Sequence, residues 1–426
     1  MNLVRYYIMN KLFMLLLFLF STGFFLYQHS SGFSWDFIVY FLNSRFYLFG
    51  GFFEWGRPPL PSFLLIPGEY FYIVLVSVLC LFASIRFSRV FRLSPEVFYA
   101  FLLSPFLLVQ GLAVGTELLS LSLTLLMFSF INSSLSGFFF SLSFMSHFSN
   151  LFNIIFLRKP KAFLLVLLTI LPFLFFNYAF SGDFLYSFLN QFALNVAMRD
   201  YYIQPVDFSH FIILASFLLP FSLYGLFHSK SKFDFLMIVF IVVRVLSFLS
   251  VPFKAPRYLF LLLVPFSYFA TKSLSRFNYR IAIPIFCLTL LLLPAYLPYA
   301  VLDSPKPYID SLSHINSSCM VLSNAWPFLN YLGVNAGPSP WPELVERRVS
   351  EGYELVFFTH IGEPDYVFNE SFMASLPVVY NDSSMIIVRD GCLPSVPYNL
   401  SYIEERNQTY ADAFNSSFSF TVWDII

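Results

Sequence analysis

The sequence has few charged residues for its length. Only 11% of its 426 residues are Asp, Glu, Lys or Arg, whereas 58% are hydrophobic and 60 are Phe. A soluble domain normally carries about 25% charged residues, and a nucleic-acid-binding domain carries a basic stripe that this chain lacks. The composition therefore excludes a soluble enzyme, a disordered chain and a nucleic-acid binder, and it predicts a polytopic α-helical membrane protein in contact with membrane lipids.

Cysteines and metal-binding motifs are also scarce. The four Cys form no CxxC pair and no HExxH motif is present, which argues against a structural zinc site or a zinc protease. Cys80 and Cys287 lie in apolar runs and are predicted to be inert core residues. Cys319 and Cys392 lie near the C-terminus, where a disulfide and two free thiols are both left open.

Charge divides the chain into two parts. Residues 1–302 contain 19 Lys and Arg against 9 Asp and Glu, whereas residues 303–426 contain 5 against 15. Such a break predicts a domain boundary, with a membrane-embedded domain over 1–302 and a small soluble α/β domain over 303–426. In the second domain the patterns predict strands at 319–323, 353–358 and 385–388, and a helix at 341–352.

Ten apolar segments predict a bundle of about ten to eleven membrane segments. They lie at about 8–27, 70–86, 97–114, 117–131, 137–157, 162–180, 208–227, 233–252, 258–271 and 281–300. Five basic clusters at alternate ends place the N-terminus in the cytoplasm by the positive-inside rule. The C-terminal domain is predicted to be extracytoplasmic. That requires an odd number of crossings, so 137–157 is predicted to be two short helices or a re-entrant hairpin with its tip near His147.

The C-terminal domain is rich in N-x-S/T sequons. Six of its nine Asn residues begin one: Asn316, Asn369, Asn381, Asn399, Asn407 and Asn415. They indicate glycan acceptors on an exported surface, although a loop composition rich in Ser and Asn also produces sequons. We therefore expect a multi-pass protein of a prokaryotic, archaeal cell membrane.

The first outer loop, at about 28–69, contains several charged residues that could act on a substrate. Residues 35–49 are predicted to form an interfacial amphipathic helix with Asp36 near its start, followed by Glu54 and Arg57. Two carboxylates and an arginine suit acid–base work on a polar substrate. The alternative is that Asp36 is only a favourable charge at a helix N-terminus, and that Glu54 and Arg57 form a local ion pair.

At this point the sequence resembles a known family. Trp35-Asp36, an interfacial helix and then GGFFEWGRPPL (50–60) are similar to the first outer loop of GT-C glycosyltransferases, in the branch of the protein mannosyltransferases and aminoarabinose transferases. Thr116-Glu117 and KAPRYLFLLLVPF (254–266) resemble two further family segments. The sequence departs from the family pattern at Phe37, where many members have Glu, and at His147, which replaces a basic residue.

The resemblance implies a GT-C-like bundle and an enzyme that transfers a sugar from a polyprenyl (dolichyl) phosphate donor to a glycan, lipid or protein acceptor, as in protein glycosylation. It implies that Asp36 is the catalytic base, and that Glu54 either shares this role or orients the acceptor. Arg257 is the expected phosphate clamp because a guanidinium binds phosphate bidentately. The other substrate-binding candidates are Arg57, Glu117, His147, Lys254 and Tyr258. A divalent metal held by Asp36 and Glu54 is left open.

Other interpretations remain. Arg244, inside the eighth apolar segment, either pairs structurally with an acid, which we favour, or reaches the phosphate. The loop at 181–207, with Arg199 to Gln204, either covers the site or anchors at the interface. As a whole, the chain could instead be a transporter or flippase, a non-enzymatic envelope scaffold, or a ligase for a lipid-linked polymer.

Overall fold

The computed structural model describes residues 2–50, 53–197, 205–228, 230–250, 254–274, 279–362 and 364–395. The chain divides into two units. The helical unit contains 2–30 and the described part of 55–301, and the α/β unit contains 31–54 and 302–395. The segment 31–54, which the sequence placed with the membrane domain, is thus part of the α/β unit.

Each of the ten apolar segments contains helix within its described residues. The α-helices of the helical unit are α1 (Asn2–Ser31), α3 (Pro59–Leu64), α4 (Glu69–Val90), α5 (Pro95–Leu102), α6 (Pro105–Gln110), α7 (Glu117–Ser129), α8 (Leu135–Ser146), α9 (Pro160–Ser181), α10 (Tyr186–Ala197), α12 (Ser209–Ala215), α13 (Leu218–Phe227), α14 (Lys232–Ser250), α15 (Leu263–Ser273) and α16 (Ala282–Tyr296). The 3-10 helices are η1 (Phe148–Phe156), η2 (Pro256–Leu262), η3 (Tyr279–Ile281) and η4 (Leu297–Tyr299).

Several apolar segments are broken rather than continuous. Among the described residues, four helices are long and apolar enough to cross a membrane: Lys11–Ser31, Glu69–Val90, Pro160–Ser181 and Ala282–Tyr299. The pair α12 and α13 bends by 92° where Ser216 has a φ of 50°. The segment 137–157 changes from α8 to η1 at His147, whose backbone is extended. The helical break expected near His147 is therefore present, and the number of crossings stays a prediction.

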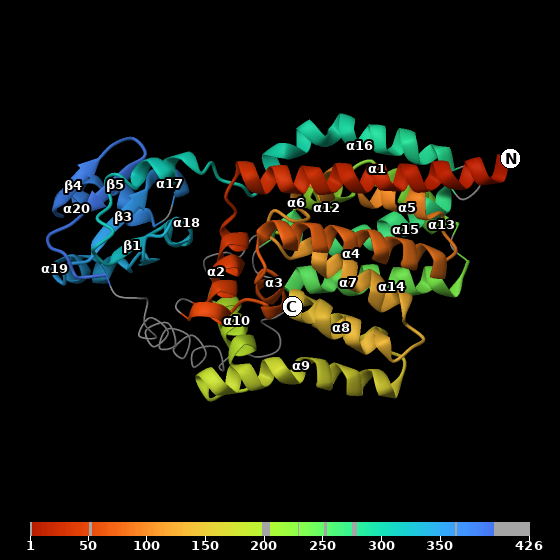
Figure 1. Ribbon diagram of the computed structural model, residues 1–426, viewed down its shortest axis with the longest axis horizontal. Coiled ribbons are helices and arrows are strands. Elements are labelled where there is room, and N and C mark those ends of the chain that lie inside the picture. Colours follow the sequence, from red (N-terminus) through yellow and green to blue (C-terminus); the bar gives the residue numbers. More distant parts are fainter. Residues whose placement is uncertain are drawn as a thin grey trace. The chain divides into compact units, whose positions relative to one another are not determined.

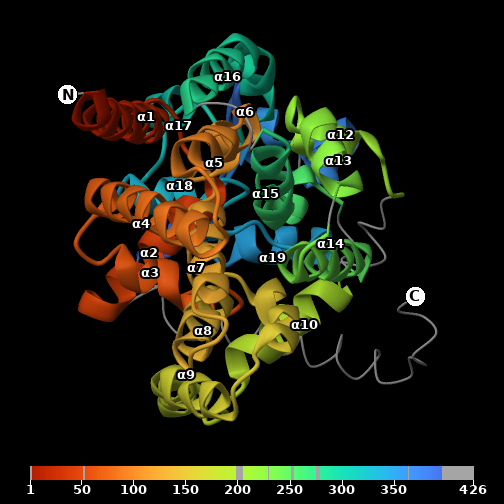
Figure 2. The ribbon, with the colours of Figure 1, turned by 90° about the vertical axis from the view of Figure 1, so that its right-hand side faces the viewer.

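Two glycines allow helices of this unit to approach closely. A Cβ at Gly137 of α8 would overlap the carbonyl oxygen of Ala162 at the start of α9. In the same way, a Cβ at Gly225 of α13 would overlap the carbonyl oxygen of Phe269 in α15. Small residues at helix contacts are typical of membrane bundles, where close backbone packing replaces the hydrophobic driving force. In the end-on view, α8 lies beside α9 and α13 beside α15 (Figure 2).

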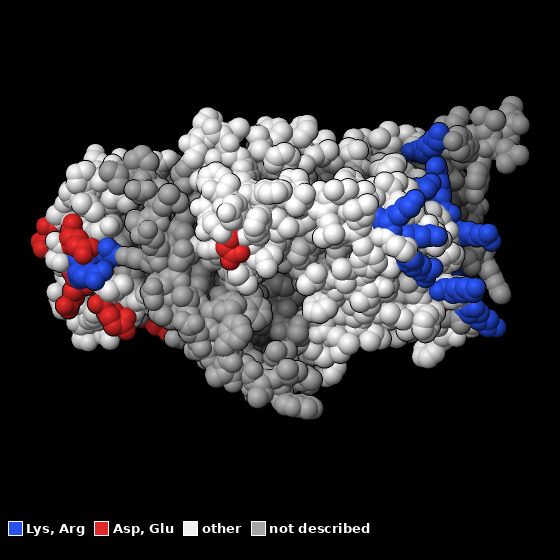
Figure 3. All heavy atoms as spheres, turned by 90° about the horizontal axis from the view of Figure 1, so that it is seen from below, with Lys and Arg blue, Asp and Glu red and all other residues white. Residues whose placement is uncertain are grey.

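Basic side chains gather at one end of the helical unit. Figure 3 shows Lys and Arg at the end where α1 begins, while the long apolar sides of the unit are almost free of charge on the face that is drawn. This separation is the pattern on which the positive-inside rule acts. The cytoplasmic location of that end remains our prediction.

The α/β unit contains a five-stranded sheet with the order β2-β1-β3-β5-β4. Its strands are β1 (Val321–Ser323), β2 (Ala336–Pro338), β3 (Glu354–Phe358), β4 (Val378–Asn381) and β5 (Met385–Val388), and its helices are α2 (Trp35–Phe49), α17 (Lys306–Ser311), α18 (Trp326–Tyr331), α19 (Val345–Ser350) and α20 (Glu370–Ala374), with the short turns η5 (Pro342–Leu344), η6 (Thr359–Ile361) and η7 (Asp365–Phe368). β1 is parallel to β2 and β3, and β5 is antiparallel to β3 and β4. The predicted α/β domain, its three predicted strands and its predicted helix are confirmed.

The two faces of this sheet carry different helices. On one face, Val356 and Phe358 of β3 share a core with α18 and with Ile38 and Val39 of α2. On the other face, the alternate residues of β3 pack with α19 and α20. Burying a Val or Ile side chain contributes about 1.5–3 kcal/mol, so Ile38 and Val39 together hold α2 in place by about 3–6 kcal/mol. The predicted helix 35–49 exists, but its Ile38 and Val39 side chains lie in a protein core. Figure 1 shows this helix, α2, beside α18.

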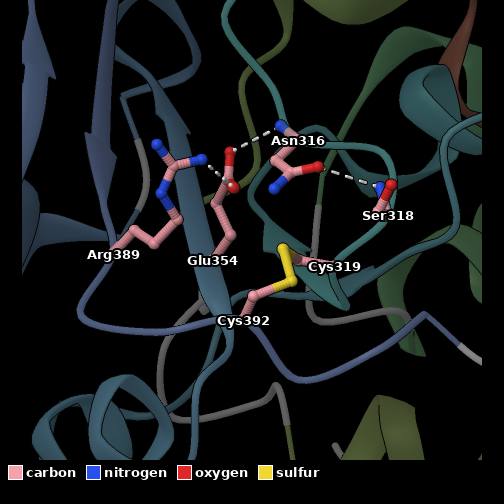
Figure 4. The surroundings of a disulfide bond; sticks show 6 residues. All are labelled: Asn316, Ser318, Cys319, Glu354, Arg389 and Cys392. Atoms are coloured by element: carbon pink, nitrogen blue, oxygen red, sulfur yellow. Dashed lines mark hydrogen bonds and ion pairs between the residues drawn. A yellow bond between two sulfur atoms is a disulfide. The ribbon is translucent and has the colours of Figure 1, made fainter.

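A disulfide and a buried ion pair close the α/β unit. Cys319, just before β1, is bonded to Cys392, beyond β5, so the disulfide left open by the sequence is present. Beside it, the fully buried Glu354 carboxylate accepts a hydrogen bond from the guanidinium of Arg389 at 3.0 Å and from the backbone N–H of Asn316 at 3.1 Å (Figure 4). Asn369 and Asn381 are exposed and Asn316 is half-buried. The last three sequons lie outside the described residues, and glycan attachment stays a prediction.

Candidate active site

The helical unit contains a polar pocket. Four parts of the chain line it: the start of α7, the junction of α8 with η1, the middle of α14, and η2. Its lining residues are Glu117, Ser120, His147, Ser149, Asn150, Arg244, Arg257, Tyr258, Phe260 and Leu261. Two guanidinium groups, a carboxylate and an imidazole thus share one cavity in an otherwise apolar bundle.

Glu117 is held at the pocket by a tight turn before α7. Gly115 has a φ of 95°, a conformation that favours glycine, and its carbonyl accepts a hydrogen bond from the Tyr72 hydroxyl. The Glu117 carboxylate is buried and accepts bonds from the backbone N–H and the hydroxyl of Thr116, at 3.3 and 3.0 Å. Its place in the first turn of α7 also suits a negative charge.

The break at His147 supplies the next wall. His147 Nδ1 lies 2.8 Å from the Ser149 hydroxyl. The Arg244 guanidinium in turn donates to that hydroxyl at 3.2 Å and to the Ser149 carbonyl at 3.0 Å. The extended backbone at His147 therefore exposes a serine to the arginine, which a continuous helix would not do.

Asn150 connects Arg244 to the helices behind it. Its side-chain oxygen lies 3.4 Å from Arg244 Nη1. Its amide nitrogen donates to the hydroxyls of Ser120 and Ser143 at 2.6 and 2.9 Å, and to the Ser143 carbonyl at 2.9 Å. The Ser143 hydroxyl also meets that of Thr124, at 3.0 Å. This network fixes Arg244 through η1, α7 and α8.

Arg244 is a buried charge of the pocket with neutral partners. It is 3% exposed, and its hydrogen-bond partners among the described residues, Ser149 and Asn150, are neutral. Among the described residues no carboxylate lies within ion-pair distance, and the Nε–H group has no hydrogen-bond partner. A buried charge without a counter-ion is costly. The acidic partner that we favoured for Arg244 is therefore not found within the described part of the chain.

η2 brings the other guanidinium. Pro256 begins this short helix, and Arg257 stacks over the ring of Tyr258 with 5.4 Å between the guanidinium carbon and the ring centroid. Lys254 precedes it and is buried, and its ammonium donates to the carbonyls of Phe248 and Leu249 at 2.9 Å. A cation at these carbonyls stabilises the C-terminal end of α14. Lys254 thus holds the segment that presents Arg257.

The remaining predicted residues lie elsewhere. Arg57 is half-buried in the turn before α3, next to Trp55, whose ring packs against Tyr186 and Phe176 at 5.2 and 5.6 Å. Asp36 lies in the first turn of α2, in the α/β unit, and is half-buried.

Glu54 also belongs to the α/β unit and is 6% exposed. Its backbone N–H donates to the side-chain oxygen of Asn43 at 2.8 Å, and its carbonyl accepts from the Asn43 amide at 3.1 Å. One amide of α2 therefore fixes the backbone of residue 54.

The pocket brings together four of the eight site residues predicted from the sequence, Glu117, His147, Arg257 and Tyr258, with Arg244 as a fifth partner. Ser120 was missed, although it lies one turn after Glu117 on the same face of α7. The described residues contain no group of three or more His, Cys, Asp or Glu that could hold a metal ion. The metal stays a prediction, and Arg199 to Gln204 lie outside the described residues.

Comparison with known proteins gives a likeness in structure only. No family model and no curated protein sequence matches the chain. Two crystal structures of ArnT from Cupriavidus metallidurans match, one bound to undecaprenyl phosphate and one in the apo state, each with a TM-score of 0.60. The first is 10% identical and covers 90% of this chain and 98% of that one; the second is 9% identical and covers 91% and 98%.

The chain therefore shares its fold with the ArnT structures. The resemblance to the aminoarabinose transferase branch, stated from three short motifs, is confirmed at the level of the fold. At 10% identity the likeness carries no residue role.

Proposed function

We propose that this protein is an integral membrane glycosyltransferase that transfers a sugar from a polyprenyl-phosphate donor to an acceptor on the extracytoplasmic side. The observation that carries the proposal is Arg244, a buried guanidinium that faces a polar cavity without a carboxylate partner among the described residues. Phosphate supplies the missing charge and accepts bidentate hydrogen bonds from a guanidinium. The undecaprenyl phosphate bound to the ArnT structure is a ligand of this chemistry.

The pocket residues would bind the donor phosphate. Arg244 and Arg257 would hold its oxygens, and Tyr258 would add a hydroxyl donor. Phe260 and Leu261 form an apolar part of the cavity lining. Glu117 would repel phosphate, so we assign it to a sugar hydroxyl or to the orientation of a neighbouring guanidinium.

The transfer step needs a base and a stabilised leaving group. The acceptor hydroxyl oxygen attacks the anomeric carbon, the bond from that carbon to the phosphate oxygen breaks, and polyprenyl phosphate leaves with the electron pair. The two guanidinium groups would stabilise the charge on the leaving phosphate. Asp36 would take the acceptor's proton, and Glu54, fixed by Asn43, would orient the acceptor. The sugar and the acceptor are left unassigned.

The roles are tested by two replacements and two matched controls. Asp36→Asn and Arg257→Ala are each assayed in membranes for transfer from a panel of polyprenyl-phosphate sugars. Loss of a general base typically costs about 10²- to 10⁴-fold in turnover, and we expect a loss of that order for Asp36→Asn. Asp310→Asn and Arg158→Ala, at exposed positions outside the pocket, should keep activity. Full activity in Asp36→Asn and Arg257→Ala would remove the mechanism.

The same membranes distinguish the rival interpretation. A transporter or flippase would move a charged lipid or polar substrate across reconstituted liposomes without sugar transfer. Flux with no transfer by the parent protein would therefore replace the proposed function with transport.

A further inference from the structure

The helix that carries Asp36 completes the fold of the C-terminal domain. One face of the sheet is covered by α18 and by α2, although the two helices are almost 300 residues apart in the sequence. Ile38 and Val39 of α2 are 3% and 0% exposed in the same core as Phe328 and Val356. Without α2, this face of the sheet would expose an apolar surface, whereas the opposite face has its own helices, α19 and α20.

Aromatic contacts fix the angle at which α2 lies on α18. The ring of Trp35 meets those of Trp326 and Phe328 edge-on, with centroid distances of 5.8 and 5.7 Å. Phe41, almost two turns further along α2, meets Tyr331 at 5.4 Å. Edge-to-face pairs depend on orientation. Two such contacts along one helix therefore restrict its rotation as well as its distance.

Polar contacts fix the residues on both sides of α2. Before the helix, Phe33 and Asp303 exchange two backbone hydrogen bonds of 2.8 and 2.7 Å, so the entry to α2 pairs with the entry to the C-terminal domain. After it, Asn43 holds the backbone of Glu54. Asp36 and Glu54 are therefore both attached to a helix that the C-terminal domain holds.

We infer that the C-terminal α/β domain positions the carboxylates of the first loop, and that Trp326 is a positioning residue that acts through Trp35. The inference rests on the catalytic roles proposed for Asp36 and Glu54. It makes the C-terminal domain necessary for turnover but not for binding of the donor phosphate, because the phosphate pocket is built from the helical unit. A C-terminal domain that only bound the acceptor would not need to include α2 in its core.

The experiment uses the full-length protein with Trp326→Ala, Trp326→Phe and Trp341→Ala. Phenylalanine keeps an aromatic ring opposite Trp35, and Trp341 is 60% exposed and serves as a matched control in the same domain. Three quantities are measured: hydrogen exchange of the α2 amides, binding of undecaprenyl phosphate, and sugar-transfer turnover. Trp326→Ala should speed exchange in α2 by about tenfold and lower turnover by a similar factor, with unchanged phosphate binding. Trp326→Phe should keep most of the slow exchange in α2 and most of the turnover of the parent protein. Trp341→Ala should resemble the parent in both quantities.

The outcomes separate this inference from the proposed function. Unchanged α2 exchange and turnover in Trp326→Ala, alongside an inactive Asp36→Asn, would overturn the inference and leave the function standing. An active Asp36→Asn would instead overturn the proposed base, while the exchange of α2 still tests its attachment. If Trp326→Ala also loses protection in β3 and β5, Trp35→Ala decides, because Trp35 is half-buried on α2 itself. Unchanged α2 exchange in Trp35→Ala would overturn the inference.

Discussion

Replacing Arg244 with Met separates a phosphate-binding role from a structural role, because the two roles predict opposite results. The side chains have similar volume, and methionine adapts to irregular cavities. The replacement removes a buried charge whose partners in the described structure are Ser149 and Asn150. It also leaves the Ser149 carbonyl without its charged donor.

The magnitudes follow from the contacts. Hydrogen bonds from a charged donor contribute about 1.5–3 kcal/mol each, whereas the effective cost of burying an ion is several kcal/mol. These terms oppose one another, so Arg244→Met should leave the free energy of unfolding within about 2 kcal/mol of the parent. Phosphate binding has no such compensation. Loss of the guanidinium should weaken it by about 3 kcal/mol, or roughly 100-fold.

The assay measures both quantities on the same purified protein. Thermal unfolding reports stability, and titration with undecaprenyl phosphate in nanodiscs reports binding. Arg158→Met, at an exposed position, controls for the loss of a positive charge. A large fall in the unfolding temperature together with an unchanged dissociation constant would refute the reasoning, and would make Arg244 a structural residue.

Three further results are expected. Gly137→Leu should lower the unfolding temperature, because any Cβ there overlaps the Ala162 carbonyl, whereas Gly23→Leu, at a position with open space, should not; equal stability would contradict the close approach of α8 and α9. Asn43→Leu should lower turnover without changing phosphate affinity, since it frees the backbone of Glu54; unchanged turnover would make the contact dispensable. The hydrogen bond from the Tyr380 hydroxyl, together with those from the backbone and hydroxyl of Ser384 and the backbone of Met385, holds the pKa of Asp382 well below its ordinary value of 3.8. Its carboxylate therefore stabilises the α/β unit at neutral pH and loses this effect as the pH falls below that value, so Asp382→Asn should flatten the acid limb of thermal stability against pH.

Hydropathy and local pattern predicted most of the helices and strands. The ten apolar segments all contain helix within their described residues, because long apolar runs leave few alternatives. β1, β3 and β5 were predicted from their apolar runs. β2 and β4 were not, since Ala336–Pro338 contains Gly and Pro, and Val378–Asn381 is a short edge strand with mostly exposed residues.

Long-range packing could not be predicted from the sequence. The helix at 35–49 was predicted correctly, but nothing near it in the chain indicates that Trp326 and Phe328 lie against it. For the same reason the boundary at residue 302 could not include 31–54 in the C-terminal unit. The break near His147 was predicted because the number of crossings required it, whereas nothing in the sequence indicated the break at Ser216, which is one serine within an apolar run.

The candidate site was partly predictable. Arg257 and Glu117 stand out because charged residues are rare in this sequence, and they do meet in one pocket. The role of Asn150 as a support for Arg244 depends on three-dimensional contacts with Ser120 and Ser143, which no spacing indicates. Lys254 was predicted to assist with phosphate, and the structure places its ammonium on the last carbonyls of α14.

The central claim is that the pocket of Arg244 and Arg257 binds a polyprenyl phosphate. Its most direct test is mass spectrometry of lipids that remain bound to the protein purified from its own membranes, compared with the Arg244→Met and Arg257→Ala variants. We predict a polyprenyl phosphate or its sugar ester in the parent protein and its loss from both variants. The same lipid at equal occupancy in all three proteins, or no phosphorylated isoprenoid in the parent, would contradict the account.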